Sequence, residues 1–324
     1  MTPFIPGDHL PPISLPDASG QMVDLAHQSI AGQHRVLLLR PDANPVLGPE
    51  GVTLFSIHPV PPDGQRDLPG PVRLFDPERR LFAAFGLPEG GVITLTPRGK
   101  LGFAGTDLAA ALASITPTRA PAPVLLIPGV LDRALVADLI AHWEAGEKSR
   151  DRVASAAGGA TAAANIKRRT DVMLDDRALY ARVQQRIERR VLAEMWRAFR
   201  FRAARFEAPR IGCYDASDAG AFGAHRDNRT PYTAQRRFAM SLNLNTGAYQ
   251  GGTLRFPEFG TDDYEPEAGG CAIFCCDLLH EAMPVTAGRR LAIFTFFTDQ
   301  EGAAAEQKLM AEAAARGDAG IRMR

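Results

Sequence analysis

The first 115 residues of the chain contain short runs of apolar residues that do not alternate with polar ones. Such runs are typical of strands that are buried on both faces. They lie at Val36–Leu39, Val72–Phe75 and Gly91–Leu95. A turn at Pro97–Gly99 predicts a hairpin between the last run and Leu101–Phe103. With helices expected after Asp76, as the N-cap, and over Asp107–Ile115, this region is predicted to be a compact α/β unit.

A proline-rich segment, Thr116–Pro123, separates this region from one with a different pattern. Its three prolines stiffen the chain, and we predict a linker there. Apolar residues at helical spacing follow over Ala134–Glu147 and Arg177–Arg200, which predicts two helices. An Ala- and Glu-rich closing helix is expected over Ala303–Ala315.

Short strand-like segments with Gly and Asp between them dominate the chain from Pro209 onward. The candidate strands are Arg210–Tyr214, Phe222–His225, Phe238–Leu244, Thr253–Phe256, Cys271–Cys276 and Leu291–Phe297. Closely spaced strands of this kind predict an antiparallel sandwich or barrel. The chain is therefore expected to have two domains, at residues 1–117 and 124–324, with a linker at residues 118–123.

Two further segments allow more than one interpretation. Nine Arg and only three Glu lie between Arg182 and Arg210. A solvated helix face and a docking site for an acidic partner or substrate both fit this composition. Residues 154–164 are rich in Ala and Gly without apolar periodicity. We interpret them as a loop that could act as a lid over a site, with a weak Ala helix as the alternative.

Composition narrows the classes of protein to be considered. The 324 residues include 37 basic and 37 acidic side chains, so the formal net charge is zero. This balance gives no electrostatic reason to expect binding to nucleic acid or to a membrane. No apolar stretch approaches the roughly 18 residues of a membrane span, and the N-terminus lacks the pattern of a secretory signal. Four cysteines without a paired framework are typical of a reducing cytoplasm, which is the expected location.

Two histidines and an aspartate in the C-terminal half form the pattern that carries chemistry. His225 and Asp227 are two residues apart, so on an extended strand both side chains project to the same face. His280 follows much later in the chain and must come from another strand. Two imidazoles and one carboxylate that leave three positions open form the facial triad of non-haem Fe(II) oxygenases. By itself this HxD…H pattern is a weak signal.

Arg290 strengthens the pattern. It lies ten residues after His280, at the start of the apolar run Leu291–Phe297. A buried guanidinium is costly without an anion to pair with, and its planar fork suits a carboxylate. We therefore expect Arg290 to bind a dicarboxylic co-substrate.

These residues and their surroundings are similar to those of a known family. The motif residues are Tyr214, His225, Asp227, Gly251–Phe256, His280, Pro284–Thr286, Gly288 and Arg290. Together they resemble the 2-oxoglutarate/Fe(II)-dependent oxygenases of the prolyl-4-hydroxylase-like group. The resemblance extends from Pro123 to Thr298, and the combined motif set is specific.

The resemblance implies a double-stranded β-helix, which is a distorted jelly roll, with flanking helices. It implies that His225, Asp227 and His280 ligate iron, that Arg290 binds the distal carboxylate of 2-oxoglutarate, and that Tyr214 helps to hold the same co-substrate. Fe(II), 2-oxoglutarate and O2 are then the expected cofactor and co-substrates. The expected reaction is hydroxylation of a C–H bond coupled to formation of succinate and CO2.

Other conspicuous residues have structural interpretations. His142 falls within the predicted helix and is expected to be structural. Gly251–Gly252 is expected where side chains would clash at a strand entry. Cys275–Cys276 is expected to be a buried strand pair. Tyr214 as an ordinary barrel tyrosine remains an alternative to its role in co-substrate binding.

The first region has a resemblance of its own, over residues 3–115. It is carried by Gly7–Asp8, Pro16–Gly20, Val36–Leu39 and Phe75–Leu87, which resemble the thioredoxin-like fold of peroxiredoxins. A peroxidatic site needs a thiolate after the first central strand, but the segment Arg40–Pro45 has none, and no cysteine precedes Cys213. We therefore expect a thioredoxin-like domain without peroxidase chemistry, with a structural, docking or substrate-presenting role.

Three hypotheses follow for the whole protein. The first is a 2-oxoglutarate-dependent dioxygenase that acts on an amino acid, a peptide or a small carboxylate; Arg168 and Arg169 favour an acidic substrate. The second is a non-enzymatic scaffold or assembly protein built on two degenerate enzyme folds. The third is a cupin-like metal enzyme that does not use 2-oxoglutarate. The expected partner is a small-molecule or peptide substrate, with protein docking through the N-terminal domain or a homodimer left open.

Overall fold

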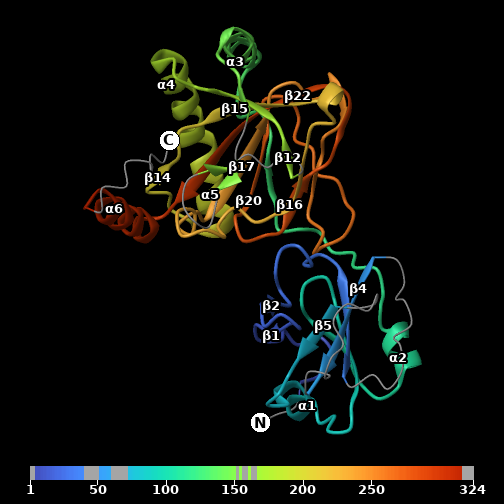
Figure 1. Ribbon diagram of the computed structural model, residues 1–324. Coiled ribbons are helices and arrows are strands. Elements are labelled where there is room, and N and C mark those ends of the chain that lie inside the picture. Colours follow the sequence, from blue (N-terminus) through green and yellow to red (C-terminus); the bar gives the residue numbers. More distant parts are fainter. Residues whose placement is uncertain are drawn as a thin grey trace. The chain divides into compact units, whose positions relative to one another are not determined.

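The computed structural model describes residues 4–39, 51–59, 72–150, 153–154, 160–161 and 166–315. The chain folds into two compact units (Figure 1). The first unit consists of Met1–Pro121 and Phe256–Thr261, and the second of Ala122–Arg255 and Asp262–Arg324. The short segment Phe256–Thr261 joins the first unit through the N–H of Ala120, which donates to the carbonyl of Phe259.

A five-stranded mixed sheet forms the centre of the first unit. Its order is β5-β4-β3-β6-β7; β3, β4 and β5 run parallel, whereas β6 and β7 are each antiparallel to the strand before them in this order. The strands are β3 (His34–Leu39), β4 (Val52–His58), β5 (Val72–Phe75), β6 (Gly91–Leu95) and β7 (Leu101–Gly105), beside a hairpin of β1 (Ser14–Pro16) and β2 (Met22–Asp24). The predicted strands and the hairpin turn are confirmed. Leu37, Ile57 and Ile93 are fully buried in the core that these strands build.

Helix α1 (Arg80–Ala84) begins later than the sequence predicts. Asp76 is not the N-cap residue, because Arg79 occupies that position with a left-handed φ of 55°. The Asp76 carboxylate nevertheless accepts hydrogen bonds from the first two N–H groups of the helix and stabilises its start across the intervening turn. Helix α2 (Leu108–Ala113) is capped by Asp107, as expected.

Two antiparallel sheets form the second unit. The larger has the order β8-β20-β17-β22-β15-β13-β9, with β14 and β18 also paired to β22, and the smaller has the order β12-β16-β21-β19. The strands of the larger sheet are β8 (Leu125–Ile127), β9 (Ser149–Arg150), β13 (Thr170–Met173), β14 (Arg205–Phe206), β15 (Arg210–Asp215), β17 (Phe238–Asn243), β18 (Tyr249–Gly251), β20 (Cys271–Cys275) and β22 (Val285–Thr298). Those of the smaller sheet are β12 (Lys167–Arg168), β16 (Ala221–His225), β19 (Leu254–Arg255) and β21 (His280–Ala282). This is the sheet-rich, jelly-roll-like architecture that the strand pattern predicts.

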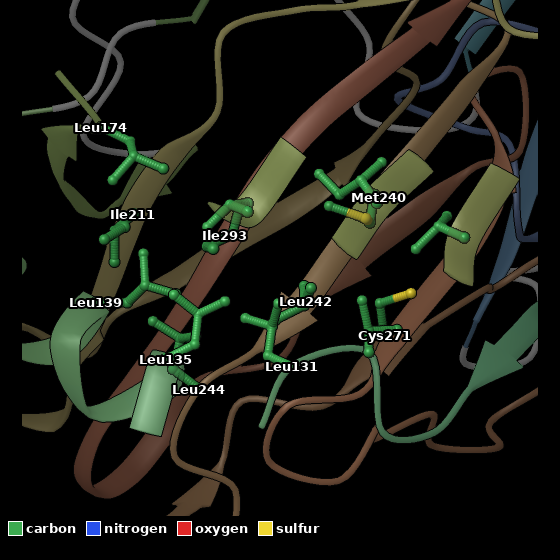
Figure 2. Close-up of a cluster of buried hydrophobic side chains, with 14 of the residues drawn as sticks. Leu131, Leu135, Leu139, Leu174, Ile211, Met240, Leu242, Leu244, Cys271 and Ile293 are labelled. Atoms are coloured by element: carbon green, nitrogen blue, oxygen red, sulfur yellow. The ribbon is translucent and has the colours of Figure 1, made fainter. Parts of the chain in front are cut away.

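Alternation along the strands gives the larger sheet two different faces. Ile211 on β15, Leu242 on β17 and Ile293 on β22 project to one face and join the apolar core (Figure 2). Neighbouring positions such as Ser241 and Arg290 project from the opposite face. One face of the sheet therefore carries the core, and the other is available for polar chemistry.

Helices supply the other half of this core. Helix α3 (Arg133–Ala145) contributes Leu135, Leu139 and Trp143, as its predicted periodicity requires. The single helix predicted over residues 177–200 is instead α4 (Arg177–Arg186), a π-helical turn η1 (Ile187–Val191) and α5 (Leu192–Phe199). The buried positions 183, 187, 191 and 195 recur every four residues, and this spacing would drift around an α-helix of 3.6 residues per turn. The wider π turn offsets the drift and keeps these side chains on the core.

The remaining elements are short or terminal. The closing helix is confirmed as α6 (Gln300–Ala315), and a 3-10 turn η2 (Ala216–Asp218) follows β15. The loop interpretation of residues 154–164 lies outside the described residues, except for the antiparallel pair β10 (Val153–Ala154) and β11 (Ala160–Thr161). No helix in the described part of the chain is long and apolar enough to cross a bilayer.

Candidate metal centre

Strand register brings the two histidines together. Strand β16 ends at His225, and its pairing with β21 places His225 directly opposite His280. The Asp227 carboxylate lies between the two rings: its Oδ1 is 3.5 Å from His225 Nε2 and its Oδ2 is 3.3 Å from His280 Nε2. One ligand atom from each of the three residues lies within 4.8 Å of the others, a spacing that suits a single metal ion.

Backbone carbonyls fix the orientation of both rings. His225 Nδ1 is 2.8 Å from the Gly223 carbonyl oxygen, and His280 Nδ1 is 3.0 Å from that of Leu278. A carbonyl oxygen only accepts, so each Nδ1 carries the proton and each Nε2 presents a lone pair. Metal-bound histidines are oriented in this way, with the second ring nitrogen donating to a nearby acceptor.

The electrostatics favour the protonation states that a cation needs. Burial lowers the pKa of His280 to about 4, and the charge of His225 acts in the same direction. Burial alone would raise the pKa of the Asp227 carboxyl, but His280 and His225 outweigh it and hold that pKa well below its usual value. At neutral pH the centre therefore offers a carboxylate beside the neutral imidazole of His280.

Aromatic rings pack directly on both imidazoles. Phe222 stacks on His225 with ring centroids 3.5 Å apart, and Phe274 lies 4.6 Å from His280. Neither phenylalanine was singled out from the sequence. Their packing restricts ring rotation and shields part of the centre from water.

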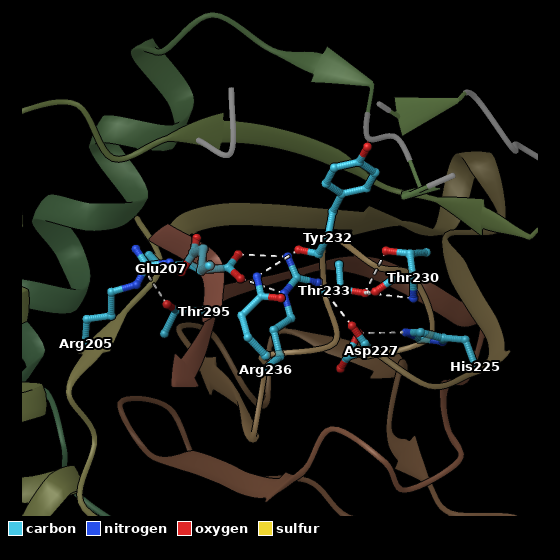
Figure 3. Close-up of polar contacts among 11 residues, drawn as sticks. Arg205, Glu207, His225, Asp227, Thr230, Tyr232, Thr233, Arg236 and Thr295 are labelled. Atoms are coloured by element: carbon cyan, nitrogen blue, oxygen red, sulfur yellow. Dashed lines mark hydrogen bonds and ion pairs between the residues drawn. The ribbon is translucent and has the colours of Figure 1, made fainter. Parts of the chain in front are cut away.

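Polar contacts hold the loop after Asp227 (Figure 3). The hydroxyls of Thr230 and Thr233 are 2.9 Å apart. Arg236 donates to both carboxylate oxygens of Glu207, at 2.6 and 2.8 Å, and its Nη1 lies 3.4 Å from the Asp227 carbonyl. Sequence reasoning missed this ion pair because nothing in the spacing of the two residues indicates that they meet.

Arg290, on β22, is only 1% exposed. Its Nη2 donates to Ser241 Oγ at 2.8 Å and to Asn243 Oδ1 at 2.9 Å, both on β17. Its Nε and Nη1 are buried and have no hydrogen-bond acceptor among the described residues. A buried cation with two unused donors fits an anion supplied from outside the protein.

The surroundings of Arg290 leave room for its long side chain. Tyr214 is its register partner across β15 and β22, with the ring centroid 5.6 Å from the Arg290 Cζ. A Cβ added at Gly252 would lie only 3.1 Å from Arg290 Cδ, so the expected exclusion of side chains there is confirmed. Tyr249, which sequence reasoning missed, accepts a hydrogen bond from Asn243 Nδ2 at 3.2 Å.

A second arginine in this unit is buried but fully paired with a carboxylate. Arg169 donates to both oxygens of Asp171, at 2.7 and 2.8 Å. Its guanidinium carbon lies 4.2 Å from the Phe294 ring centroid. The pair lies over Gly212, where an added Cβ would approach both side chains to 2.7 Å. The only sequence signal for this pair was two opposite charges two residues apart.

Other candidates lie away from the centre or are structural. His142 Nε2 is 3.0 Å from the Met173 carbonyl, in line with its structural interpretation. All four cysteines are free thiols. Burial raises the pKa of Cys213 and of Cys271 to about 12, so both are protonated at neutral pH. Cys276 is buried as expected, whereas Cys275 is only partly so.

Comparison with known proteins bears on the same segment. Residues 210–298 match the family model of the 2OG-Fe(II) oxygenase superfamily. This segment contains all three residues of the metal centre and Arg290.

Curated relatives that match the chain are PKHD-type hydroxylases. The one from Azoarcus sp. is 29% identical over 102 residues, which are 29% of this chain and 45% of that protein. Those from Saccharophagus degradans and Xanthomonas axonopodis pv. citri are 33% and 31% identical over 26% and 30% of this chain, and over 41% and 46% of their own lengths. The chain thus spans less than half the length of these curated relatives.

Solved structures of prolyl hydroxylases are also similar to part of the chain. A Trichoplax adhaerens prolyl hydroxylase, in complex with a peptide fragment of a hypoxia inducible factor, has a TM-score of 0.43 and 16% identity over 56% of this chain and 86% of its own. A Pseudomonas putida prolyl-4-hydroxylase has a TM-score of 0.41 and 19% identity over 55% of this chain and 94% of its own.

Proposed function

We propose that this protein is an Fe(II)- and 2-oxoglutarate-dependent dioxygenase that hydroxylates a C–H bond of its substrate. The observation that carries the proposal is the convergence of His225 Nε2 and His280 Nε2 on the two oxygens of Asp227. Two imidazoles and one carboxylate on one side of an ion suit Fe(II) with open positions. The match of residues 210–298 to the 2OG-Fe(II) oxygenase superfamily supports the same function.

Each residue has a defined task within this proposal. His225, Asp227 and His280 would hold the iron, and the carbonyl contacts of both Nδ1 atoms keep each Nε2 aimed at it. Bound Fe(II) with 2-oxoglutarate supplies oxygen activation, coupled to conversion of the co-substrate to succinate and CO2. Arg290 would bind the distal carboxylate of 2-oxoglutarate, because its Nε and Nη1 are buried without an acceptor while β17 holds its Nη2. Tyr214, whose ring centroid lies 5.6 Å from Arg290 Cζ, would help to hold the same co-substrate.

An amino acid, a peptide or a small carboxylate is the proposed substrate. The curated relatives are named hydroxylases, which supports hydroxylation as the reaction. Positioning of the substrate C–H bond next to the metal is the contribution that the protein itself makes.

The test is Fe(II)- and 2-oxoglutarate-dependent succinate formation in wild type and in His225→Ala, with His142→Ala as the matched control. His225→Ala should reduce both succinate formation and binding of Mn(II), measured by calorimetry, by at least about 100-fold, because one of three ligands is lost. His142→Ala should leave both unchanged. Equal succinate formation in wild type and His225→Ala would refute the proposal.

For the first unit we propose a thioredoxin-like scaffold without redox chemistry. Its support is the mixed sheet in which the adjacent strands β5, β4 and β3 run parallel and β6 and β7 are antiparallel, together with the absence of cysteine before Cys213. A structural or docking role follows. Consumption of hydrogen peroxide in the presence of a thiol reductant should therefore stay at the rate of the buffer, and a faster rate would contradict this role.

A further inference from the structure

A groove of about 460 Å³ lies in the second unit, between the edge of the larger sheet and the arginine-rich helical segment. One side of it is formed by β8 (Leu125–Ile127) and Pro128. The other side consists of residues from η1 and α5, which are Arg189, Arg190, Ala193, Glu194 and Arg197. The groove is separate from the metal centre, because neither the metal ligands nor Arg290 line it.

Positive charge exceeds negative charge in this groove. Its three arginines are accompanied by a single carboxylate, that of Glu194, which Arg197 contacts at 2.9 Å. Arg189 has no ion-pair partner among the described residues. Arg190 donates to the backbone carbonyls of Gly129 and Val130, just after β8, and these neutral acceptors leave its charge unmatched.

Arginines one or two turns earlier in the same helical segment are balanced differently. On α4, Arg182 contacts Asp138 at 2.7 Å and Arg186 contacts Asp132 at 3.1 Å. Such pairs are typical of a solvated helix face, which was one of the two interpretations of this composition. The arginines at the groove fit the other interpretation, a docking site for an acidic partner.

Strand β8 provides a second feature of a docking site, because it lies at the edge of the larger sheet. It pairs with β20 alone, through Leu125, Leu126 and Ile127. The backbone groups of these residues have no further hydrogen-bond partner among the described residues. An unpaired strand edge is a template for another extended segment, which can add to the sheet as one more strand.

Alternation along β8 defines which side chains such a segment would need. Leu125 and Ile127 point towards the core, on the side of the sheet that η1 and α5 cover. Leu126 points to the opposite side and is 47% exposed. In an added strand, every second side chain would therefore lie near Arg189 and Arg197, where carboxylates suit, and the others beside Leu126, where apolar groups suit.

We propose that this groove binds an extended segment of a partner protein in which acidic and apolar residues alternate, as an additional strand beside β8. The proposal goes beyond the proposed enzymatic function and does not depend on it. A second copy of this chain is disfavoured as the occupant, because two-fold pairing of β8 with itself would bring two arginine-lined surfaces together. A nucleic acid is disfavoured because the groove has no aromatic side chain among its lining residues on which a base could stack.

Binding of defined peptides to the full-length protein is the first test. The probe is a short acetylated and amidated peptide of alternating Val and Glu, followed by fluorescence anisotropy of an attached dye. Peptides with Gln or Lys in place of Glu are the controls for charge. The Glu peptide should bind about 10-fold or more tightly than the Gln peptide at low salt, and this advantage should shrink in about 0.5 M NaCl. The Lys peptide should not bind.

Two further measurements test strand addition. A Glu peptide with methyl groups on its backbone nitrogens keeps its charges but has no backbone donors, so its affinity should be about 10-fold or more lower. Hydrogen–deuterium exchange locates the bound peptide. The Glu peptide should slow exchange of the amides of β8 and leave those of β9 (Ser149–Arg150), at the other edge of the same sheet, unchanged.

Matched double variants assign the charge preference to the groove. Arg189→Gln/Arg197→Gln removes two of the three arginines and should weaken binding of the Glu peptide about 10-fold or more. Arg177→Gln/Arg182→Gln removes the same charge from exposed positions on α4, outside the groove, and should change it by no more than about 2-fold. Succinate formation should be unchanged in both variants.

Three results would each overturn the proposal: equal affinity for the Glu and Gln peptides, equal affinity for the N-methylated peptide, or unchanged affinity in Arg189→Gln/Arg197→Gln. Tighter binding of a single-stranded oligonucleotide with the same number of charges would also overturn it and assign the groove to nucleic acid. These results leave the proposed function untouched, since succinate formation measures that function separately.

Conversely, a wild-type protein that forms no succinate but binds the Glu peptide as described would refute only the proposed function.

Discussion

Arg290 and Arg169 are both buried in the second unit, but their charges are balanced in different ways. Arg169 gives two hydrogen bonds to Asp171, so its charge is matched within the protein. Arg290 has only the neutral acceptors Ser241 and Asn243 at Nη2, and none for Nε and Nη1 among the described residues. Residue type and burial are similar, and the presence of a carboxylate at contact distance is what differs. Arg169, with a matched charge, contributes to the fold, whereas the unmatched charge of Arg290 is the basis for the proposed binding of an anion there.

The largest expected effect separates the two arginines by function. Arg290→Met should raise the KM for 2-oxoglutarate roughly 100-fold or more, because the co-substrate loses a buried charge partner. The free energy of unfolding should change by no more than about 1 kcal/mol, since no internal ion pair is broken. Succinate formation measures the first quantity and urea unfolding the second. An unchanged KM would favour a cupin-like enzyme that does not use 2-oxoglutarate.

Substitution of the other buried arginine, Arg169, tests its contribution to the free energy of unfolding. Arg169→Met should lower the free energy of unfolding by about 3–5 kcal/mol, because it leaves the Asp171 carboxylate buried without its partner. Urea unfolding followed by circular dichroism measures the loss. The double variant Arg169→Met/Asp171→Leu should recover most of it. If Arg169→Met is as mild as Arg290→Met, the contrast between the two sites is wrong.

The pH dependence of that loss sharpens the comparison. Burial opposes ionisation of Asp171, but Arg169 holds the pKa of its carboxyl below the usual value. The stabilisation by the pair is therefore complete above the ordinary Asp pKa of about 4 and is lost as the pH falls through the lowered pKa.

In Arg169→Met, the pKa of Asp171 rises relative to wild type, because its main cationic partner is lost and burial is opposed only by the charges of Lys167 and Arg210. Protonation of Asp171 then relieves the unpaired charge as the pH falls. The difference in unfolding free energy between wild type and Arg169→Met should be largest near pH 7. It should shrink towards pH 4, by at most about 1.4 kcal/mol per pH unit for one proton. Urea unfolding at pH values across this range measures the difference. A difference that does not change with pH would contradict the conclusion that the charge of Asp171 causes the loss of stability in Arg169→Met.

The smallest expected effect concerns the space that the pair occupies. A Cβ at Gly212 would lie 2.7 Å from both Arg169 and Asp171, so Gly212→Ala should cost about 1–3 kcal/mol through overpacking. Gly223 provides the control, since an added Cβ there meets only the Ile166 carbonyl at 3.7 Å. Gly223→Ala should change stability by no more than about 0.5 kcal/mol. Thermal unfolding of the two variants compares them, and equal losses would show that the space over Gly212 is not tight.

Local patterns predicted much of the fold because they act over a few residues. The apolar runs gave β3, β5 and β6, and the apolar periodicity gave α3. The start predicted for α1 was wrong, because Arg79, with a left-handed backbone conformation, lies between Asp76 and the first helical residue. The π-helical turn at residues 187–191 was missed, because it depends on which side chains of the helix must face the tertiary core.

Contacts between distant segments were beyond the reach of sequence patterns. Arg236 and Glu207 meet because the loop after Asp227 folds back towards the end of β14. Lys167 lies on Phe222 because β12 pairs with β16 in one particular register. Both contacts depend on how segments far apart in the chain are brought together, and no local spacing encodes them.

The sequence by itself determined the ligand types, the two-residue spacing of His225 and Asp227, and an arginine at the start of an apolar strand. Alternation of side chains along a strand is a local property, so these could be read directly. Only the tertiary structure decided that His280 lies opposite His225, and that Arg169 is matched by a carboxylate while Arg290 is not. Pairing and burial depend on how sheets align residues that are far apart in the chain, and that alignment gives one buried arginine a carboxylate partner and leaves the other without one.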